Sequence, residues 1–422
     1  MTIAFKSHWC QYLTLLTFVT SCCAATNLLA QWPEFLGPGG NPVIVSGSLP
    51  DHFEVEKDGQ ASVNIAWRTS LPGRSVSSPI VADGKVFTTG SWGMEGRWQH
   101  VAAMDAQSGQ ILWQRAMQAT GRPHCHPTSA NAAPSPCTDG RQVYAFFSSN
   151  DLACYDLEGN LVWFRSLVDA HPLAGNDVGM SSSPVVVDSV VVAVVECQGD
   201  SFAVGIDSAS GATLWELPRP RKANWSSPRA LTTRDGQSLV LIHNDEGVVA
   251  VQPRNGKVVW TLPDRCSTIA TAVAAGDWLF LPGDGLGAYR VTDGLTAPQS
   301  AWRSNRINPS SASPLFVESI GVLALNRSVL VCCDTSGQLQ WQTRLPDAGQ
   351  FWATPLVVGR RLYAFASSGK CFIVDLTETG GEVVGQSDLG TEVLGSPAAD
   401  QDALYVRSVD ALWKIQEARD RS

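Results

Sequence analysis

One stretch of the chain reads Ala103-Met104-Asp105-Ala106-Gln107-Ser108-Gly109-Gln110-Ile111-Leu112-Trp113, and its pattern decides the fold because it returns along the sequence. The spacing is an Asp, a Gly four residues later and a Trp four residues after that. Complete, shortened or degenerate copies follow at Asp156-Gly159-Trp163, Asp207-Gly211-Trp215, Gln252-Gly256-Trp260, Tyr289-Gly294-Trp302, Asp334-Gly337-Trp341 and Asp375–Gly381, the last without a Trp. A repeat of this kind indicates a modular fold of similar units.

A second landmark alternates with the first. A Ser-Pro or Thr-Pro pair precedes an apolar run in seven units, and Ala270-Thr271 takes its place in the fifth unit. These pairs are Ser78-Pro79, Ser135-Pro136, Ser183-Pro184, Ser227-Pro228, Ser313-Pro314, Thr354-Pro355 and Ser396-Pro397. The two landmarks together predict eight units of roughly 41 to 57 residues.

Within a unit the local pattern is typical of β-strands. The runs 185–187 and 190–195 are β-branched and lie between Pro184 and a polar turn. No apolar stripe with a period of 3.6 residues reaches helical length after the first thirty residues, which disfavours repeats built from helix pairs. Four short strands with tight turns fit each unit.

Such units predict an all-β, eight-bladed β-propeller of four-stranded antiparallel blades, because radial stacking buries both faces of each sheet. The strand at 63–67 has no unit of its own, so we expect it to join the last blade and close the ring. Seven blades are the alternative if the degenerate unit near 375–395 merges with its neighbour. The Trp side chains that we expect to fill the space between blades are Trp67, Trp113, Trp163, Trp215, Trp260 and Trp341.

The first thirty residues contain one Lys, no acidic residue and a short apolar run from Tyr12 to Val19, which predicts an export signal. Cleavage after Ala30 and lipidation of Cys22 are both compatible with this segment. The predicted organisation is a signal at 1–30, a lead-in at 31–62, one propeller at 63–415 and a tail at 416–422. The net charge of −9 argues against nucleic acid as a partner, and no second long apolar run indicates a membrane span.

The cysteines allow two interpretations. Cys125 and Cys137 flank a Pro-rich loop and could pair in an exported protein, or each could be a free thiol in the fold. The vicinal pair Cys332-Cys333 directly precedes the turn at Asp334. We therefore expect this pair to lie in a blade strand.

Three polar or aromatic clusters are candidate contacts for a ligand or partner. The loop that contains His124, His126 and Asn131 has metal-ligand residue types, but a loop held by prolines explains it as well. Glu196 and Asp200 lie on a turn where they could bind a cation or be solvated. A hairpin insertion with Trp92 and Trp98 could form an exposed recognition patch or a lid.

The repeat Ala103 to Trp113, with Ser108 in a Thr position, resembles the docking motif of the quinoprotein-type, or PQQ-like, β-propeller repeat family. The resemblance covers roughly residues 63–415 and implies one of two functions. One branch contains dehydrogenases that hold pyrroloquinoline quinone on a Trp and Ca²⁺ between Glu, Asn and Asp, with an Asp base. The other contains non-catalytic propellers, similar to BamB, which bind other proteins.

The chain lacks the long insertions and the C-x-x-C-H haem motif found among such dehydrogenases, and none of the common hydrolase, P-loop or EF-hand motifs occurs. We therefore expect an exported, periplasmic or envelope-associated propeller without a catalytic site or cofactor, which binds a protein partner or ligand. The alternative is an oxidoreductase dependent on PQQ and Ca²⁺ with a divergent site.

Overall fold

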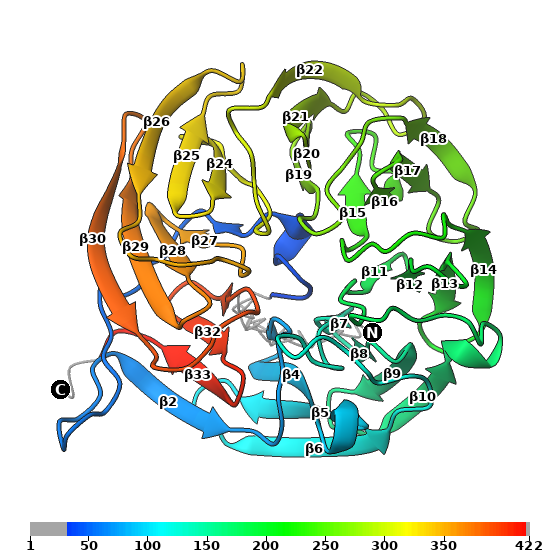
Figure 1. Cartoon of the computed structure of the whole chain (residues 1–422), viewed down its shortest axis with the longest axis horizontal. Coiled ribbons are helices and arrows are strands. Elements are labelled where there is room, and N and C mark those ends of the chain that lie inside the picture. The colour runs from blue at the N-terminus through cyan, green and yellow to red at the C-terminus, as the bar shows by residue number, and fades with distance from the viewer. Residues whose placement is uncertain (1–31, 419–422) are drawn as a thin grey trace, which may run out of the picture.

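The computed structural model of the chain describes residues 32–418, so the predicted signal and Cys22 lie outside the described residues. Figure 1 shows the strands arranged as separate sheets in a ring, and we call the axis of this ring the channel. Within residues 32–418 there are eight sheets, each with four antiparallel strands, and one sheet carries a fifth, parallel strand. The prediction of an all-β, eight-bladed propeller is confirmed.

The first four blades run in chain order, with strand one at the channel and strand four at the outside. Blade one contains β3 (Ile80–Ala82), β4 (Lys85–Trp92), β5 (Trp98–Asp105) and β6 (Ile111–Gln118). Blade two contains β7 (Cys137–Thr138), β8 (Gln142–Phe146), β9 (Asp151–Asp156) and β10 (Leu161–Ser166). Blade three contains β11 (Val185–Val187), β12 (Val190–Val195), β13 (Phe202–Asp207) and β14 (Thr213–Pro218). Blade four contains β15 (Arg229–Thr232), β16 (Ser238–Asn244), β17 (Gly247–Val251) and β18 (Val258–Leu262).

The last four blades continue the same order. Blade five contains β19 (Val273–Ala275), β20 (Trp278–Gly283), β21 (Gly285–Arg290) and β22 (Gln299–Ser304). Blade six contains β23 (Leu315–Val317), β24 (Gly321–Asn326), β25 (Val329–Cys333) and β26 (Leu339–Arg344). Blade seven contains β27 (Leu356–Val358), β28 (Arg361–Phe365), β29 (Lys370–Leu376), β30 (Gly381–Asp388) and the parallel strand β1 (Val43–Ile44). Blade eight contains β31 (Ala398–Ala399), β32 (Leu404–Arg407), β33 (Ala411–Ile415) and β2 (Ile65–Ser70); the short 3₁₀ turns are η1 (Pro38–Gly40), η2 (Met94–Gly96) and η3 (Leu167–Asp169).

Strand β2 closes the ring as the sequence predicted. It pairs antiparallel with β33, so the outer strand of blade eight comes from the beginning of the propeller sequence. The degenerate unit near 375–395 forms the outer half of blade seven and does not merge with its neighbour. The seven-bladed alternative is therefore wrong.

The repeated Asp and Gly build the turn between the third and fourth strands. In blade one, Asp105 Oδ1 accepts hydrogen bonds from the Ser108 backbone N–H (2.7 Å) and hydroxyl (2.6 Å). These bonds lower the pKa of Asp105 because they stabilise its carboxylate. Gly109 has φ +71°, and a Cβ there would lie 2.5 Å from the Trp67 ring. A glycine is needed both for the backbone conformation and for the neighbouring indole.

The repeated Trp side chains lie between adjacent blades. Trp113 Nε1 donates a hydrogen bond to the Leu157 carbonyl of the next blade (2.8 Å), and its ring packs over Gly159. All six Trp residues that we singled out are buried in the same kind of position. Trp302 makes the equivalent bond to the Thr335 carbonyl (2.8 Å), although the insertion before it obscured the spacing.

Blade seven lacks its Trp, and a distant segment takes over the seam with blade eight. Gly385 pairs with Ile373 at the register where Trp215 pairs with Gly205 in blade three. A Cβ at Gly385 would lie 1.8 Å from the Asp51 carbonyl oxygen, so the lead-in (residues 31–62) occupies the space of a side chain. Phe53 of the lead-in is buried there against Phe365, with ring centroids 6.3 Å apart.

The Ser-Pro landmark forms a ring of hydrogen bonds that we call the hydroxyl belt. Seven of the eight belt residues donate their backbone N–H to the side-chain oxygen of the belt residue in the next blade, at 2.9 to 3.1 Å. The belt residues are Ser78, Ser135, Ser183, Ser227, Thr271, Ser313, Thr354 and Ser396. Seven links are present in the described residues, but the Ser78 hydroxyl, which would close the eighth, is buried without a partner.

The lead-in crosses the channel three residues beyond the belt along the inner strands. Trp32 exchanges backbone bonds with Val81, and Asn41 exchanges side-chain bonds with the backbone of Phe316. The Glu34–Arg229 ion pair (3.2 Å) holds the segment between these contacts, and burial raises the pKa of Glu34. Figure 1 shows this dark blue segment in the middle of the ring. The channel is therefore blocked on one side of the belt.

Candidate functional site

The belt defines one face of the molecule, which we call the belt face. Inner strands begin at the belt, so the loops between strands two and three and the connections between blades lie on this side. A cavity of about 440 Å³ opens here. Belt hydroxyl residues and Phe35 of the lead-in are among the residues that line it. The cavity has one mouth, because the lead-in fills the channel behind the belt.

The lining of this cavity is uncharged and mostly apolar. The walls include Val76, Trp225, Ile269, Trp352 and Leu394, and the polar lining residues are serines, threonines and His126. Among the described residues that line the cavity, none is Lys, Arg, Asp or Glu, and His126 is the one histidine. A cavity of this size and composition suits an uncharged group.

Exposed apolar side chains extend this lining onto the surface of the belt face. Val178, Ile269 and Trp352 line the cavity and are each 40% exposed. We call these three residues the apolar rim. Met94 and Leu173 are also exposed on loops of the belt face, outside the cavity lining. Single exposed apolar residues are ordinary, but a group around a cavity is typical of a recognition surface.

The loop that contains His124, His126 and Asn131 lies at this mouth, but its three side chains have different partners and do not form one site. His126 lines the cavity and bonds Thr128 Oγ1 through Nδ1 (2.8 Å). His124 faces Glu95 (3.9 Å), whereas Asn131 is buried and binds the Gly96 carbonyl (3.1 Å). Within residues 32–418 no three His, Cys, Asp or Glu side chains are placed to hold a metal ion together.

The aromatic hairpin packs beside this loop. Trp92 stacks on Trp98, with ring centroids 6.0 Å apart and planes 13° apart. Trp98 remains 38% exposed, while His100 behind Trp92 is fully buried. The hairpin and the histidine loop, which the sequence presents as separate clusters, therefore form one wall of the belt face. Neither Trp92 nor Trp98 is among the residues that line the cavity.

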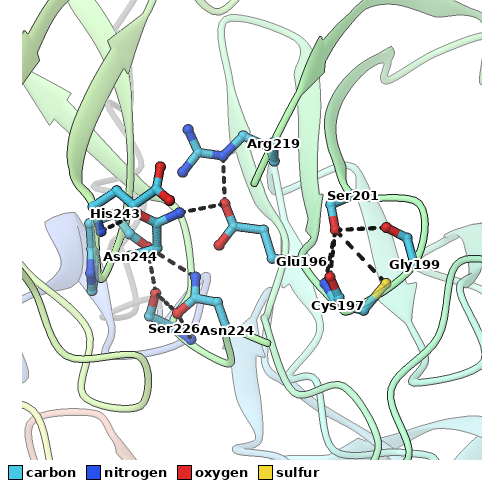
Figure 2. Close-up of polar contacts among 10 residues, drawn as sticks. Glu196, Cys197, Gly199, Ser201, Arg219, Asn224, Ser226, His243 and Asn244 are labelled. Carbon is cyan, nitrogen blue, oxygen red and sulfur yellow. Dashed lines mark hydrogen bonds and ion pairs between the residues drawn. The ribbon is translucent and has the colours of Figure 1, made fainter. Parts of the chain in front are cut away.

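Glu196 and Asp200 do not form a shared site. Glu196 is only 1% exposed, so the expectation that it is solvated is wrong. Its Oε1 accepts hydrogen bonds from Arg219 Nε (2.5 Å) and Asn244 Nδ2 (3.2 Å), between blades three and four (Figure 2). Asp200 instead accepts the Leu173 backbone N–H (3.1 Å) and faces Arg221.

The network around Glu196 is buried and incompletely paired. Asn224 Nδ2 and the Ser226 hydroxyl both donate to the His243 carbonyl (3.0 Å each; Figure 2). Glu196 Oε2 has no hydrogen-bond partner, and burial raises the pKa of this carboxyl although Arg219 lowers it. The members of this network lie on blades three and four, so the network connects the two blades. Removing any one member would leave buried polar atoms unpaired.

The cysteines in the described residues are separate thiols. Cys125 and Cys137 do not form a disulfide, and Cys137 is fully buried. Cys332 and Cys333 end strand β25, as expected, and burial raises the pKa of each thiol to about 12. Neither pair contributes to the cavity.

Sequence comparison supports the repeat assignment. The family model described as outer membrane protein assembly factor BamB matches residues 59–262. Over these residues, just under half of the chain, the sequence matches a family of PQQ-like propellers. BamB of Shewanella oneidensis is 25% identical over 72% of this chain and 72% of its own length. A polyvinylalcohol dehydrogenase of a Sphingopyxis species is 21% identical over 85% of this chain, which spans 55% of that enzyme.

Solved structures show the same fold in both branches of PQQ-like propellers. BamB from Moraxella catarrhalis matches with a TM-score of 0.63 at 16% identity, over 85% of this chain and 98% of that one. Quinohemoprotein alcohol dehydrogenase from Comamonas testosteroni matches with a TM-score of 0.68 at 12% identity, over 93% of this chain and 82% of that one. These structural similarities establish the fold alone, and the chemistry has to be inferred from the side chains of the site.

The side chains that line the cavity do not match the quinone of the enzyme branch, and the network around Glu196 does not match its Ca²⁺. Pyrroloquinoline quinone carries carboxylates, yet the cavity lining offers no guanidinium or ammonium group among the described residues. Glu196 and Asn244 have the residue types that the resemblance implies for Ca²⁺. Their partner, however, is the Arg219 cation, and Asn244 directs its N–H toward Glu196. A calcium ion needs six to eight oxygen ligands and would face this guanidinium.

No helix within residues 32–418 is both long and apolar enough to cross a bilayer.

Proposed function

We propose that this chain is an exported, non-catalytic propeller of the cell envelope that binds another protein through its belt face. The observation that carries the proposal is the uncharged cavity with its apolar rim, on the face where the connections between blades gather. A rigid ring of β-blades that presents loops on one face is well suited to recognition. The likeness to proteins named as outer membrane assembly factors supports the same view.

The proposal includes the organisation of the chain. Residues 1–30 would direct export, with cleavage after Ala30 or a lipid anchor at Cys22 as the two possible ends of processing. Residues 31–62 would be the lead-in, residues 63–415 the propeller and residues 416–422 a tail. An intact-mass measurement of the mature protein distinguishes the two processing sites.

Site-specific photocrosslinking tests the binding face. A photoreactive amino acid at Trp352 or Ile269, on the apolar rim, is expected to give covalent adducts with another protein in intact cells. Matched positions are Leu112, on the outer strand β6, and Leu295, in the loop between β21 and β22, which are also exposed apolar residues. Adducts from these control positions alone would contradict the proposal.

The dehydrogenase-like relative makes enzyme activity the competing function. The lining chemistry argues against it, because quinone carboxylates and Ca²⁺ find no matching side chains around the cavity. Incubation with pyrroloquinoline quinone and Ca²⁺, followed by gel filtration and a dye-reduction assay with alcohols and sugars, is expected to give neither retained quinone nor reduced dye. Retention with turnover would replace the binding proposal with the enzyme.

A further inference from the structure

We propose that the belt-face cavity receives an uncharged, apolar loop tip of the protein partner. This inference rests on the proposed function and specifies which part of the partner is bound. The observations that carry it are the charge of the lining, the single mouth of the cavity and the continuity between the cavity and the apolar rim.

The lining determines the charge of the occupant. A carboxylate or ammonium group brought among these residues would lose its water without gaining a counter-charge, since none of the described lining residues is Lys, Arg, Asp or Glu. Apolar side chains would instead pack against Trp225, Ile269 and Leu394. Lining hydroxyls such as that of Ser311, whose side chain is half-buried, can donate hydrogen bonds to backbone carbonyls of the occupant.

The blocked channel determines the shape of the occupant. The lead-in crosses the channel beyond the belt, and Phe35 lines the cavity from that side. A chain cannot thread through the ring, so whatever enters must leave by the same mouth. A volume of about 440 Å³ holds a few side chains and no folded unit, which favours a protruding tip.

The apolar rim favours a protein over a small molecule. A small ligand inside the cavity would leave the outward parts of Val178, Ile269 and Trp352 in water, since each residue is 40% exposed. A loop tip brings its flanking residues and the surface around them onto the rim, where buried aromatic anchors contribute strongly to affinity. Sugars fit poorly because the lining lacks Asp, Glu, Asn and Gln, whose planar groups pair with adjacent hydroxyls.

A phage-displayed library of disulfide-constrained seven-residue loops is the probe for a binding test. Panning against the purified protein is expected to select loops with uncharged, aromatic or aliphatic tips. Ser311→Trp fills the cavity and should weaken selected loops at least tenfold. Gln107→Trp adds the same indole to an exposed turn on the opposite face and should leave affinity unchanged.

Three results would overturn the inference: selection of loops with charged tips, selection of loops whose affinity does not change in Ser311→Trp, and selection of no loops at all. Circular dichroism and melting check that both variants fold; if Ser311→Trp does not, Trp352→Ala tests the same mouth by removing an exposed side chain and should also lower affinity. Failure of both variants to change affinity counts against the inference.

Crosslinking separates this inference from the proposed function. The yield of adducts from Ile269 should fall in the Ser311→Trp background and persist in the Gln107→Trp background. An undiminished yield in both backgrounds would retain a belt-face partner and reject insertion into the cavity. Absence of adducts from every rim position would reject the proposed function itself.

Discussion

The hydroxyl belt gives a sharp test of the propeller because one of its members lacks the bond that the others make. Ser183→Ala removes the oxygen that accepts the Ser135 backbone N–H (2.9 Å), while the Ser183 N–H keeps its own bond to Ser227. Ser78→Ala removes a hydroxyl that is buried without a partner, while the Ser78 N–H keeps its bond to Ser135. The two substitutions are chemically identical and occupy equivalent positions in different blades.

The expected magnitudes follow from what each substitution leaves behind. A buried N–H that loses its acceptor costs about 1–3 kcal/mol, so Ser183→Ala should lower the free energy of unfolding by that amount. Ser78→Ala removes an unpaired polar atom and should change the same quantity by less than about 0.5 kcal/mol, or raise it.

Equilibrium unfolding in urea measures both variants against the parent protein. Near-ultraviolet circular dichroism of the folded variants verifies that the packing of the Trp side chains is preserved. Equal destabilisation by the two substitutions would refute the idea that the belt has seven hydrogen bonds and lacks the eighth, between blades eight and one.

Three other outcomes follow from the structure. Trp215→Ala should lower the free energy of unfolding by roughly 3–5 kcal/mol, measured by urea denaturation, because a large buried aromatic and its bond to the Pro253 carbonyl (2.6 Å) are lost; a fully stable variant would show that Trp215 is not wedged between blades. Burial lowers the pKa of His243 from 6.5 to about 4, so the unfolded chain takes up the proton first and stability should fall by about 3 kcal/mol between pH 6.5 and 4. In His243→Gln, which can still accept the Ala272 N–H, that part of the pH dependence should disappear from the unfolding curves; an unchanged slope would exclude His243 as its source. In the folded protein without its leader, a thiol reagent should label Cys125 and spare the seven buried cysteines. Mass spectrometry identifies the labelled residues, and rapid labelling of Cys332 would contradict this prediction.

Part of the candidate site could be predicted from sequence and part could not. The histidine loop and the aromatic hairpin were recognised because Pro, His and Trp stand out in a chain of short strands. Their meeting was not predictable, since the contact between His124 and Glu95 joins segments whose arrangement depends on blade packing. The cavity itself was missed, because serines and small apolar residues spread over all the blades carry no local signal.

Glu196 shows why local reading of charge fails. A carboxylate beside Gly199 and Asp200 in sequence has the appearance of a solvated turn. It is buried because Arg219, which follows the outer strand of the same blade, and Asn244 of the next blade both bond it. The seam at Gly385 is similar, because its missing indole is replaced by Phe53 and Asp51, which lie far away in the chain.

The amino-acid sequence alone predicted the eight blades, the turns and the closing strand, and the structure excluded the seven-bladed alternative. These features depend on short-range patterns: Asp–Ser–Gly turns, alternating β-branched residues and an indole at constant spacing. The tertiary structure decided which hydroxyls join one blade to the next, how the lead-in blocks the channel and where an uncharged cavity opens. Those features arise from contacts between residues distant in sequence, and such contacts exist only after the ring has closed.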